Sequence, residues 1–210
     1  MAKSQQAQDI CLHYRFENDS AIVYRVVYNI TNTASPQINF KKDNDSLKIS
    51  YGYKFINQDV EDPFKEEYFT SLAEFKTDQF GNKPKKNDSI NFVEKLFNVN
   101  LFLPEYSSKC IKKGDSWTTE NDLHSALYKK VLKNYQLVEH RVTDSVIKFS
   151  GSYFKSDELS SEKIIDGEYI VDNKSGTVIR ADLLVKLKEK NYSYKMIITR
   201  ISDDGFWKSH

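Results

Sequence analysis

The sequence has few of the residues that break or specialise a chain. Seven glycines and four prolines in 210 residues are too few for a collagen-like, linker-like or wholly disordered protein. The 31 basic and 30 acidic side chains nearly cancel, so the net charge of +1 creates no general field that would attract nucleic acid or anionic lipid. No apolar run approaches the roughly 20 residues that span a bilayer. These absences leave a globular chain long enough to bury one core.

Catalytic and metal-binding signatures are absent from the sequence as well. There is no G-x-S-x-G elbow, and His13, His124, His140 and His210 have no H-E-x-x-H or C-x-x-C spacing around them. Cys11 lies two residues before His13, but His13 is better explained as an exposed strand residue. We therefore predict no catalytic residue, no metal site and no cofactor. One enzyme class stays open: a hydrolase of glycans or lipids with carboxylates on separate strands.

The two cysteines, Cys11 and Cys110, leave the redox state open. A disulfide between them would close a long loop and contribute a few kcal/mol. Two unpaired thiols are the alternative, because the sequence does not place them within bonding distance.

Alternation with a period of two dominates the chain and predicts antiparallel strands with one wet face. The clearest examples are residues 22–30, 47–55, 179–187 and 192–198, in which tyrosine and aliphatic residues recur on one side. Shorter strands are expected at residues 10–17, 37–41, 130–141, 146–153 and 164–171. Thirteen Tyr and thirteen Phe supply large rings, so a core is expected although only 39% of residues are hydrophobic.

Turn residues separate the predicted strands. Asp172 and Gly176 bound a turn between two strong strands, where glycine supplies the positive φ that a hairpin loop needs. Residues 77–82 repeat this Asp…Gly pattern more weakly. Gly114 and Asp115 form a turn in the middle of the chain, directly before Trp117, which we expect to anchor this turn in the core.

Two helices are expected among the strands. Residues 89–97 can be capped by Asp88 or Ser89 and carry an apolar stripe up to Pro104. A second helix is expected over residues 63–75, where aromatic residues fall at helical spacing. The predicted fold is therefore mainly β (α+β): a curved antiparallel sheet or half-barrel wrapped around one or two helices.

Two motifs carry a resemblance to a family. The segment LPEYSSKCIKKGDSW at residues 103–117 is followed by a Gly-x-Tyr-x-Val-Asp…Gly pattern at Gly167, Tyr169, Val171, Asp172 and Gly176. Together they resemble secreted or lipid-anchored proteins of unknown function from Bacteroidota, over about residues 100–184. That family is similar to the lipoprotein-carrier (LolA- and LolB-like) half-barrel, which can hold acyl chains. The resemblance implies a scaffold and a location, not a reaction.

Four Asp-Ser-aliphatic triplets resemble the O-glycosylation acceptor of envelope proteins in those bacteria. They would place glycans on Ser20, Ser46, Ser89 and Ser145. Ordinary turn and cap chemistry explains the same triplets, because Asp and Ser side chains bond readily to nearby main chain.

Location is a further expectation. Residues 1–10 are polar and lack the apolar region of a signal peptide, which fits either a cytosolic protein or an exported one whose signal has been replaced. We expect the second: an exported, periplasmic or outer-membrane-anchored lipoprotein. Residues 1–9 would then be a flexible tether to a lipid on a cysteine upstream of Lys3, and residues 10–207 a single β-rich domain.

The functional hypothesis is a non-catalytic binding or assembly module of the cell envelope. It would hold a lipid or other apolar ligand in the concave face of the sheet, or dock to an envelope protein. The candidate ligand-binding rings are Tyr24, Tyr28, Tyr51, Tyr53, Phe55 and Tyr194. A lysine ladder from Lys186 to Lys190 is explained by solubility and not by nucleic acid, and membrane contact would come only through the lipid anchor.

Overall fold

The computed structural model describes residues 9–16, 20–28, 32–34, 36–56, 67–82, 101, 103–122, 128–155, 161, 163–188 and 190–201. These residues form eleven strands and no α-helix, so they include no helix able to cross a membrane. The strands are β1 (Ser20–Tyr28), β2 (Asn32–Ala34), β3 (Gln37–Asp43), β4 (Ser46–Ile56), β5 (Glu67–Thr77), β6 (Ser116–Asp122), β7 (Lys130–His140), β8 (Asp144–Phe154), β9 (Lys163–Asp172), β10 (Val178–Leu187) and β11 (Tyr192–Ile201).

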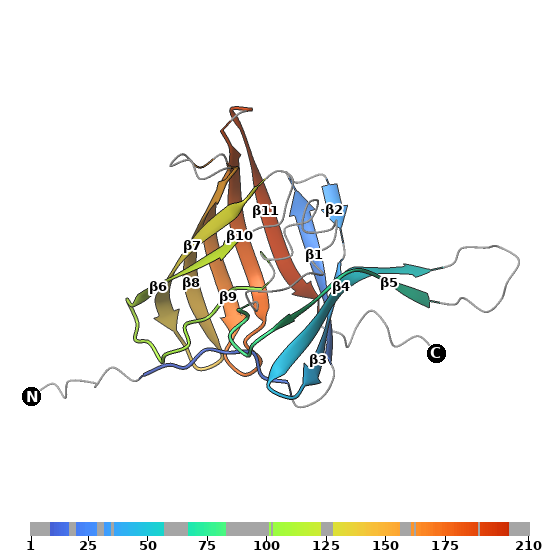
Figure 1. Cartoon of the computed structure of the whole chain (residues 1–210), viewed down its shortest axis with the longest axis horizontal. Coiled ribbons are helices and arrows are strands. Elements are labelled where there is room, and N and C mark those ends of the chain that lie inside the picture. The colour runs from blue at the N-terminus through green and yellow to red at the C-terminus, as the bar shows by residue number, and fades with distance from the viewer. Residues whose placement is uncertain are drawn as a thin grey trace, which may run out of the picture.

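All strands belong to one antiparallel sheet. Ten of them follow the order β5-β4-β3-β1-β11-β10-β9-β8-β7-β6, and the short β2 pairs with β1. The first and last strands of this path, β5 and β6, are not paired with each other, so the sheet is open and strongly curved (Figure 1). The sequence prediction of a mainly β protein with a curved antiparallel sheet is confirmed.

The alternation that predicted the strands is visible in their burial. In β10, Ala181, Leu183 and Val185 are buried while Asp182 and Lys186 are exposed. We call the side that carries the buried residues the inner face and the opposite side the outer face. All four clear strand predictions and the shorter ones in β3, β7, β8 and β9 are confirmed.

Two predictions of local structure are wrong. Residues 67–75, expected to be helical, belong to β5, which pairs with β4. A register shift between Tyr51 and Gly52 interrupts the period of two there, and pairing with a neighbour overrides local spacing. Residues 10–16 form no strand; Ile10 makes an isolated bridge to Ile111. The helix predicted at residues 89–97 lies outside the described residues.

Two segments without strand structure, residues 9–16 and 103–115, cover the inner face. Tyr14 stacks on Phe40 of β3 with ring centroids 6.2 Å apart, and its hydroxyl donates to the Pro104 carbonyl at 2.9 Å. Tyr106 is 1% exposed, and its ring lies 5.2 Å from that of Tyr14. The two segments therefore pack on each other as well as on the sheet.

The two Asp…Gly turns hold residues 9–16 from two sides. Gly176 has φ +75°, and a Cβ there would lie 2.2 Å from the His13 carbonyl oxygen. Gly81 has φ +84°, and a Cβ there would lie 2.9 Å from the Tyr14 ring. Each position therefore needs glycine both for its backbone conformation and for the close approach of the N-terminal segment.

Candidate functional site

An open groove crosses the outer face of the sheet over β6 to β11. Its volume is about 770 Å³, within the range of small-molecule sites. The lining residues are Ser116, Trp117, Thr118, Asn134, Tyr135, Gln136, Lys148, Phe149, Ser150, Asp166, Gly167, Glu168, Asp182, Leu183, Leu184, Lys195, Met196 and Ile197.

Strand register arranges these residues in three parallel rows across six strands. The middle row is Trp117, Tyr135, Phe149, Gly167, Leu183 and Met196. The side chains of Tyr135, Phe149, Leu183 and Met196 are buried, at most 3% exposed, and alternation puts them on the inner face. The middle row therefore lines the groove with its main chain.

The two flanking rows place their side chains on the outer face and form the walls of the groove. The first wall is Ser116, Gln136, Lys148, Glu168, Asp182 and Ile197; the second wall is Thr118, Asn134, Ser150, Asp166, Leu184 and Lys195. Over β6 to β9 every wall side chain is polar or charged, and Leu184 and Ile197 bring apolar surface at the β10–β11 end.

Several wall side chains are held in place by neighbours. Thr118 Oγ1 donates to Asn134 Oδ1 at 2.9 Å, and Ser150 Oγ donates to Asp166 Oδ1 at 2.8 Å. Asp182 accepts from Arg180 at 2.6 and 2.9 Å. Fixed side chains lose less conformational freedom when a ligand binds, so these walls are partly preorganised.

Lys148 and Glu168 differ from the rest of the walls. They lie directly opposite each other on β8 and β9 and are both exposed. Among the described residues no ion pair within 4.0 Å engages either of them. Both charges are thus presented to whatever occupies the groove.

The predicted ligand-binding rings do not form a site among the described residues. Tyr24 is fully buried on the inner face, and burial raises the pKa of its phenol. Tyr194 is half-buried in the neighbouring strand β11. Burial, with a further contribution from the phenols of Tyr192 and Tyr128, raises the pKa of Tyr194. Positions 28, 51, 53 and 55 (Tyr28, Tyr51, Tyr53 and Phe55) lie in β1 and β4, but their side chains lie outside the described part of the structure.

A buried ion pair, not predicted from the sequence, joins the covering segment at residues 103–115 to the inner face of the sheet. Lys133 Nζ lies 2.8 Å from Glu105 Oε1, and the two side chains are 2% and 3% exposed. The Glu105 carbonyl accepts a hydrogen bond from the Trp117 indole at 2.7 Å, and Trp117 stacks on Tyr135 at 5.2 Å. The sequence does contain a signal for this pair, because Lys133 interrupts an otherwise apolar row of inner-face residues in β7.

The inner face is rich in buried phenols. Burial raises the pKa values of Tyr14, Tyr106, Tyr135 and Tyr169 well above the ordinary tyrosine range. The Glu105 carboxylate adds to the shift in the pKa of Tyr135. These phenols are structural, since each is buried in the core cluster and not open to a ligand.

One further lysine is buried on the inner face, at the start of β9. Lys163 is 6% exposed, and its ammonium lies 5.0 Å from the Tyr153 ring centroid and 6.0 Å from that of Tyr128. Burial lowers the pKa of Lys163 to about 8. The two rings give the ammonium cation–π contacts in place of water.

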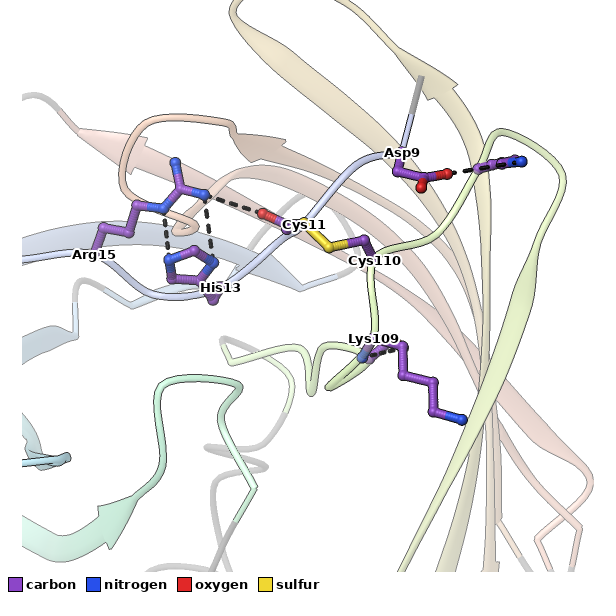
Figure 2. The surroundings of a disulfide bond; sticks show 8 residues. Asp9, Cys11, His13, Arg15, Lys109 and Cys110 are labelled. Atoms are coloured by element: carbon purple, nitrogen blue, oxygen red, sulfur yellow. Dashed lines mark hydrogen bonds and ion pairs between the residues drawn. A yellow bond between two sulfur atoms is a disulfide. The ribbon is translucent and has the colours of Figure 1, made fainter. Parts of the chain in front are cut away.

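A disulfide joins Cys11 to Cys110, 99 residues apart in sequence, which decides the question left open by the sequence (Figure 2). Both half-cystines are exposed. Arg15 donates to the Cys11 carbonyl at 3.1 Å and to His13 at 2.7 Å. Burial and then Arg15 lower the pKa of His13, so His13 acts as a hydrogen-bond acceptor in a structural cluster.

The predicted turn residues do form turns. Gly114 has φ +95°, and the Asp115 carboxylate accepts from the Lys112 main-chain N–H at 2.8 Å. Asp172 accepts from Lys174 N–H at 2.8 Å and from Arg200 at 3.2 Å. Burial by itself would raise the pKa of Asp172. The hydrogen bonds from Lys174 and Arg200 outweigh burial, so the pKa of Asp172 is lowered.

The predicted glycosylation serines fall into two groups. Ser145 is fully buried, and its hydroxyl donates to Asn173 Oδ1 at 2.6 Å, which argues against modification of this serine in the folded protein. Ser46 Oγ donates to the Asp43 carbonyl at 2.8 Å in the β3–β4 turn, as the alternative of turn chemistry predicts. The side chain of Ser20 and all of Ser89 lie outside the described part of the structure.

Comparisons with known proteins add no relative: no family model, curated protein or solved structure matches the chain. Among the residues described by the structure, no group of three or more His, Cys, Asp and Glu side chains is arranged to hold a metal ion.

Proposed function

We propose that the protein is an exported, non-catalytic binding or assembly module of the cell envelope, and that the outer-face groove is its binding surface. The observation that carries the proposal is the groove itself: about 770 Å³ in volume, crossing six strands and walled by two rows of side chains. The volume lies in the range of small-molecule sites, and the polar wall side chains are groups of the kind that orient a ligand.

The binding surface is assigned to the outer face because the inner face is occupied. Residues 9–16 and 103–115 pack on it, and Tyr24 has no exposed surface. The proposal of an apolar ligand held by the inner-face rings therefore has less support than the proposal of a ligand in the groove. A relationship to the lipoprotein-carrier half-barrel remains part of the proposal, supported by the open and curved antiparallel sheet.

Export is supported by the disulfide. Such bonds persist in oxidising compartments and are rare where thiols are kept reduced. Both cysteines of the Cys11–Cys110 disulfide are exposed to solvent, so reductants would reach the bond in a reducing compartment. A periplasmic or outer-membrane-anchored lipoprotein of the Bacteroidota type fits this chemistry.

A hydrolase with dispersed carboxylates is the second candidate, because Asp166, Glu168 and Asp182 all line the groove. Two of the three are engaged by cations: Lys186 lies 3.0 Å from Asp166, and Arg180 lies 2.6 Å from Asp182. Glycoside cleavage needs two carboxyl groups that act together, and Glu168 is the only one of these three without an ion pair among the described residues. The groove is therefore better suited to binding.

Site-specific photocrosslinking in the host cell tests the proposal. A diazirine amino acid at position 136 projects into the groove, whereas the same amino acid at Glu120, exposed on β6 outside the groove, is the matched control. We expect a crosslinked species from position 136 in exported protein and little from position 120. Equal yields at both positions would show that the groove is not a preferred binding surface.

A further inference from the structure

We propose that the groove binds a neutral, linear glycan laid across the strands, an inference that rests on the proposed role of the groove as the binding surface. Three features of the described residues support it: the main-chain floor, the chemistry of the two walls, and the length of the groove.

Over β7 to β11 the floor of the groove is closed to recognition by strand addition. Each of these strands pairs with a neighbour on both sides, whereas β6 is the edge strand of the sheet and pairs only with β7. Main-chain N–H and C=O groups between two paired strands are already engaged, and strand addition needs a free sheet edge. A ligand that lies across β7 to β11 must therefore be recognised by the wall side chains.

The walls combine hydrogen-bond donors and acceptors at short intervals. Ser116, Thr118 and Ser150 present hydroxyls, Asn134 and Gln136 present amides, and the carboxylates lie beside them on β9 and β10. A sugar hydroxyl both donates and accepts, so it can pair with carboxylates, amides, hydroxyls and ammonium groups alike. A polyhydroxyl ligand matches this mixture more completely than an acyl chain, which would leave the polar walls unpaired.

The charges at the walls are largely balanced. Asp166 is paired with Lys186, Asp182 is paired with Arg180, and Glu168 lies directly opposite Lys148. The groove therefore presents no cluster of unpaired cations, among the described residues, that would recruit a nucleic acid or a uronic-acid polymer. An uncharged ligand fits this balance best.

The dimensions of the groove favour a chain over a single sugar. Six adjacent strands spaced about 4.8 Å apart span about 24 Å from β6 to β11. Polar walls extend over β6 to β9, and Leu184 and Ile197 at the other end offer apolar surface for the C–H faces of sugar rings. An oligosaccharide of several units can contact both regions at once.

Calorimetric titration with neutral glucan, mannan and xylan oligosaccharides tests the inference, with oligogalacturonate as the anionic counterpart. We expect saturable binding of at least one neutral series and weaker binding of the anionic one. Glu168→Gln removes the carboxylate that is free in the groove and should weaken binding about tenfold or more. Glu120→Gln, on the same face outside the groove, should leave the affinity unchanged, and matching thermal unfolding should show that both variants are folded.

The outcomes separate this inference from the proposed function. Binding that survives Glu168→Gln unchanged would overturn the groove as the glycan site. If no neutral oligosaccharide binds while photocrosslinking at position 136 still exceeds that at position 120, the glycan is excluded and the groove stands as a binding surface. Absence of both signals would overturn both proposals.

Discussion

Along β7 the two faces of the sheet carry opposite kinds of side chain. Lys133, Tyr135 and Leu137 are buried on the inner face, whereas Asn134 and Gln136 are exposed on the outer face. The inner face contains desolvated charge and phenols: the Lys133 ammonium is paired with Glu105 and the Tyr14 hydroxyl bonds to the Pro104 carbonyl, whereas the Tyr169 hydroxyl has no hydrogen-bond partner among the described residues. The outer face contains charge that is hydrated. The same residue types therefore differ greatly in their contribution to stability according to the face they occupy.

Alkaline unfolding is the strongest test of this difference. The phenols of Tyr14, Tyr24, Tyr106, Tyr135 and Tyr169 have raised pKa values in the folded protein, whereas unfolded tyrosine ionises near pH 10. Above about pH 10 the unfolded chain loses protons that the folded chain keeps, so stability falls as pH rises. Five groups give a slope approaching about 7 kcal/mol per pH unit.

Urea unfolding at several pH values between about 8 and 11, followed together with tyrosinate absorbance, measures this slope. We expect five phenols to ionise only as the protein unfolds. If all thirteen tyrosines titrate before unfolding, the inner face is open to water and the comparison of faces fails.

The ion pairs on the two faces provide the next largest contrast. Glu105→Gln leaves the Lys133 ammonium buried without its carboxylate and should cost about 3–5 kcal/mol. Asp182→Asn breaks an exposed pair with Arg180, whose two side chains are 47% and 51% exposed, and should cost less than about 1 kcal/mol. Urea unfolding of the two variants measures the difference.

A double variant, Glu105→Leu with Lys133→Met, sharpens the same comparison. Apolar replacement of both partners should recover most of the loss, because a buried pair costs desolvation as well as gaining attraction. A double variant as unstable as Glu105→Gln would show that the hydrogen bonds around Glu105, and not the charge pair, stabilise this region.

The disulfide tests how firmly the two covering segments must be held to the inner face. Replacing both Cys11 and Cys110 with Ala removes a crosslink between residues 99 apart and should cost about 2–4 kcal/mol. Reduction of the wild-type protein with dithiothreitol should lower its unfolding midpoint to that of the variant and leave the variant unaffected. A variant with unchanged stability would show that packing of Tyr14 and Tyr106 alone is sufficient.

Replacement of Lys163 should change stability in the opposite direction, because this buried charge destabilises the folded protein. The pKa of Lys163 is about 8 in the folded protein but about 10.4 in the unfolded chain, so folding disfavours the charged form. At pH 7 this costs up to about 3 kcal/mol, partly offset by the cation–π contacts with Tyr128 and Tyr153. Lys163→Met should therefore raise stability by about 1–3 kcal/mol at pH 7.

The pH dependence identifies the cause of that gain. As pH rises from about 8 to 10.4, the folded wild type releases the Lys163 proton and its penalty disappears, so the advantage of Lys163→Met should shrink. Lys148→Met, exposed on the outer face, should change stability by less than about 0.5 kcal/mol at either pH. A gain that is constant with pH would point to packing and not to charge.

The sequence by itself determined the strands and most of the turns, because these depend on neighbours in the chain. A period of two marked β1, β4, β10 and β11, and the turn residues marked the positions of Gly114 and Gly176. The same local reasoning failed for β5, where pairing with β4 decided the structure, and for residues 10–16, whose strand-like pattern reflects burial by contacts distant in sequence.

Only the tertiary structure decided the candidate site. The groove exists because register aligns residues of six strands, and register cannot be read from any one strand: a shift of one residue would exchange the walls with the buried row. The bond between Cys11 and Cys110, the pairing of Glu105 with Lys133 and the alignment of Lys148 with Glu168 all depend on this long-range geometry. Local residue patterns record which face of a strand is buried, whereas contacts between strands decide which side chains meet.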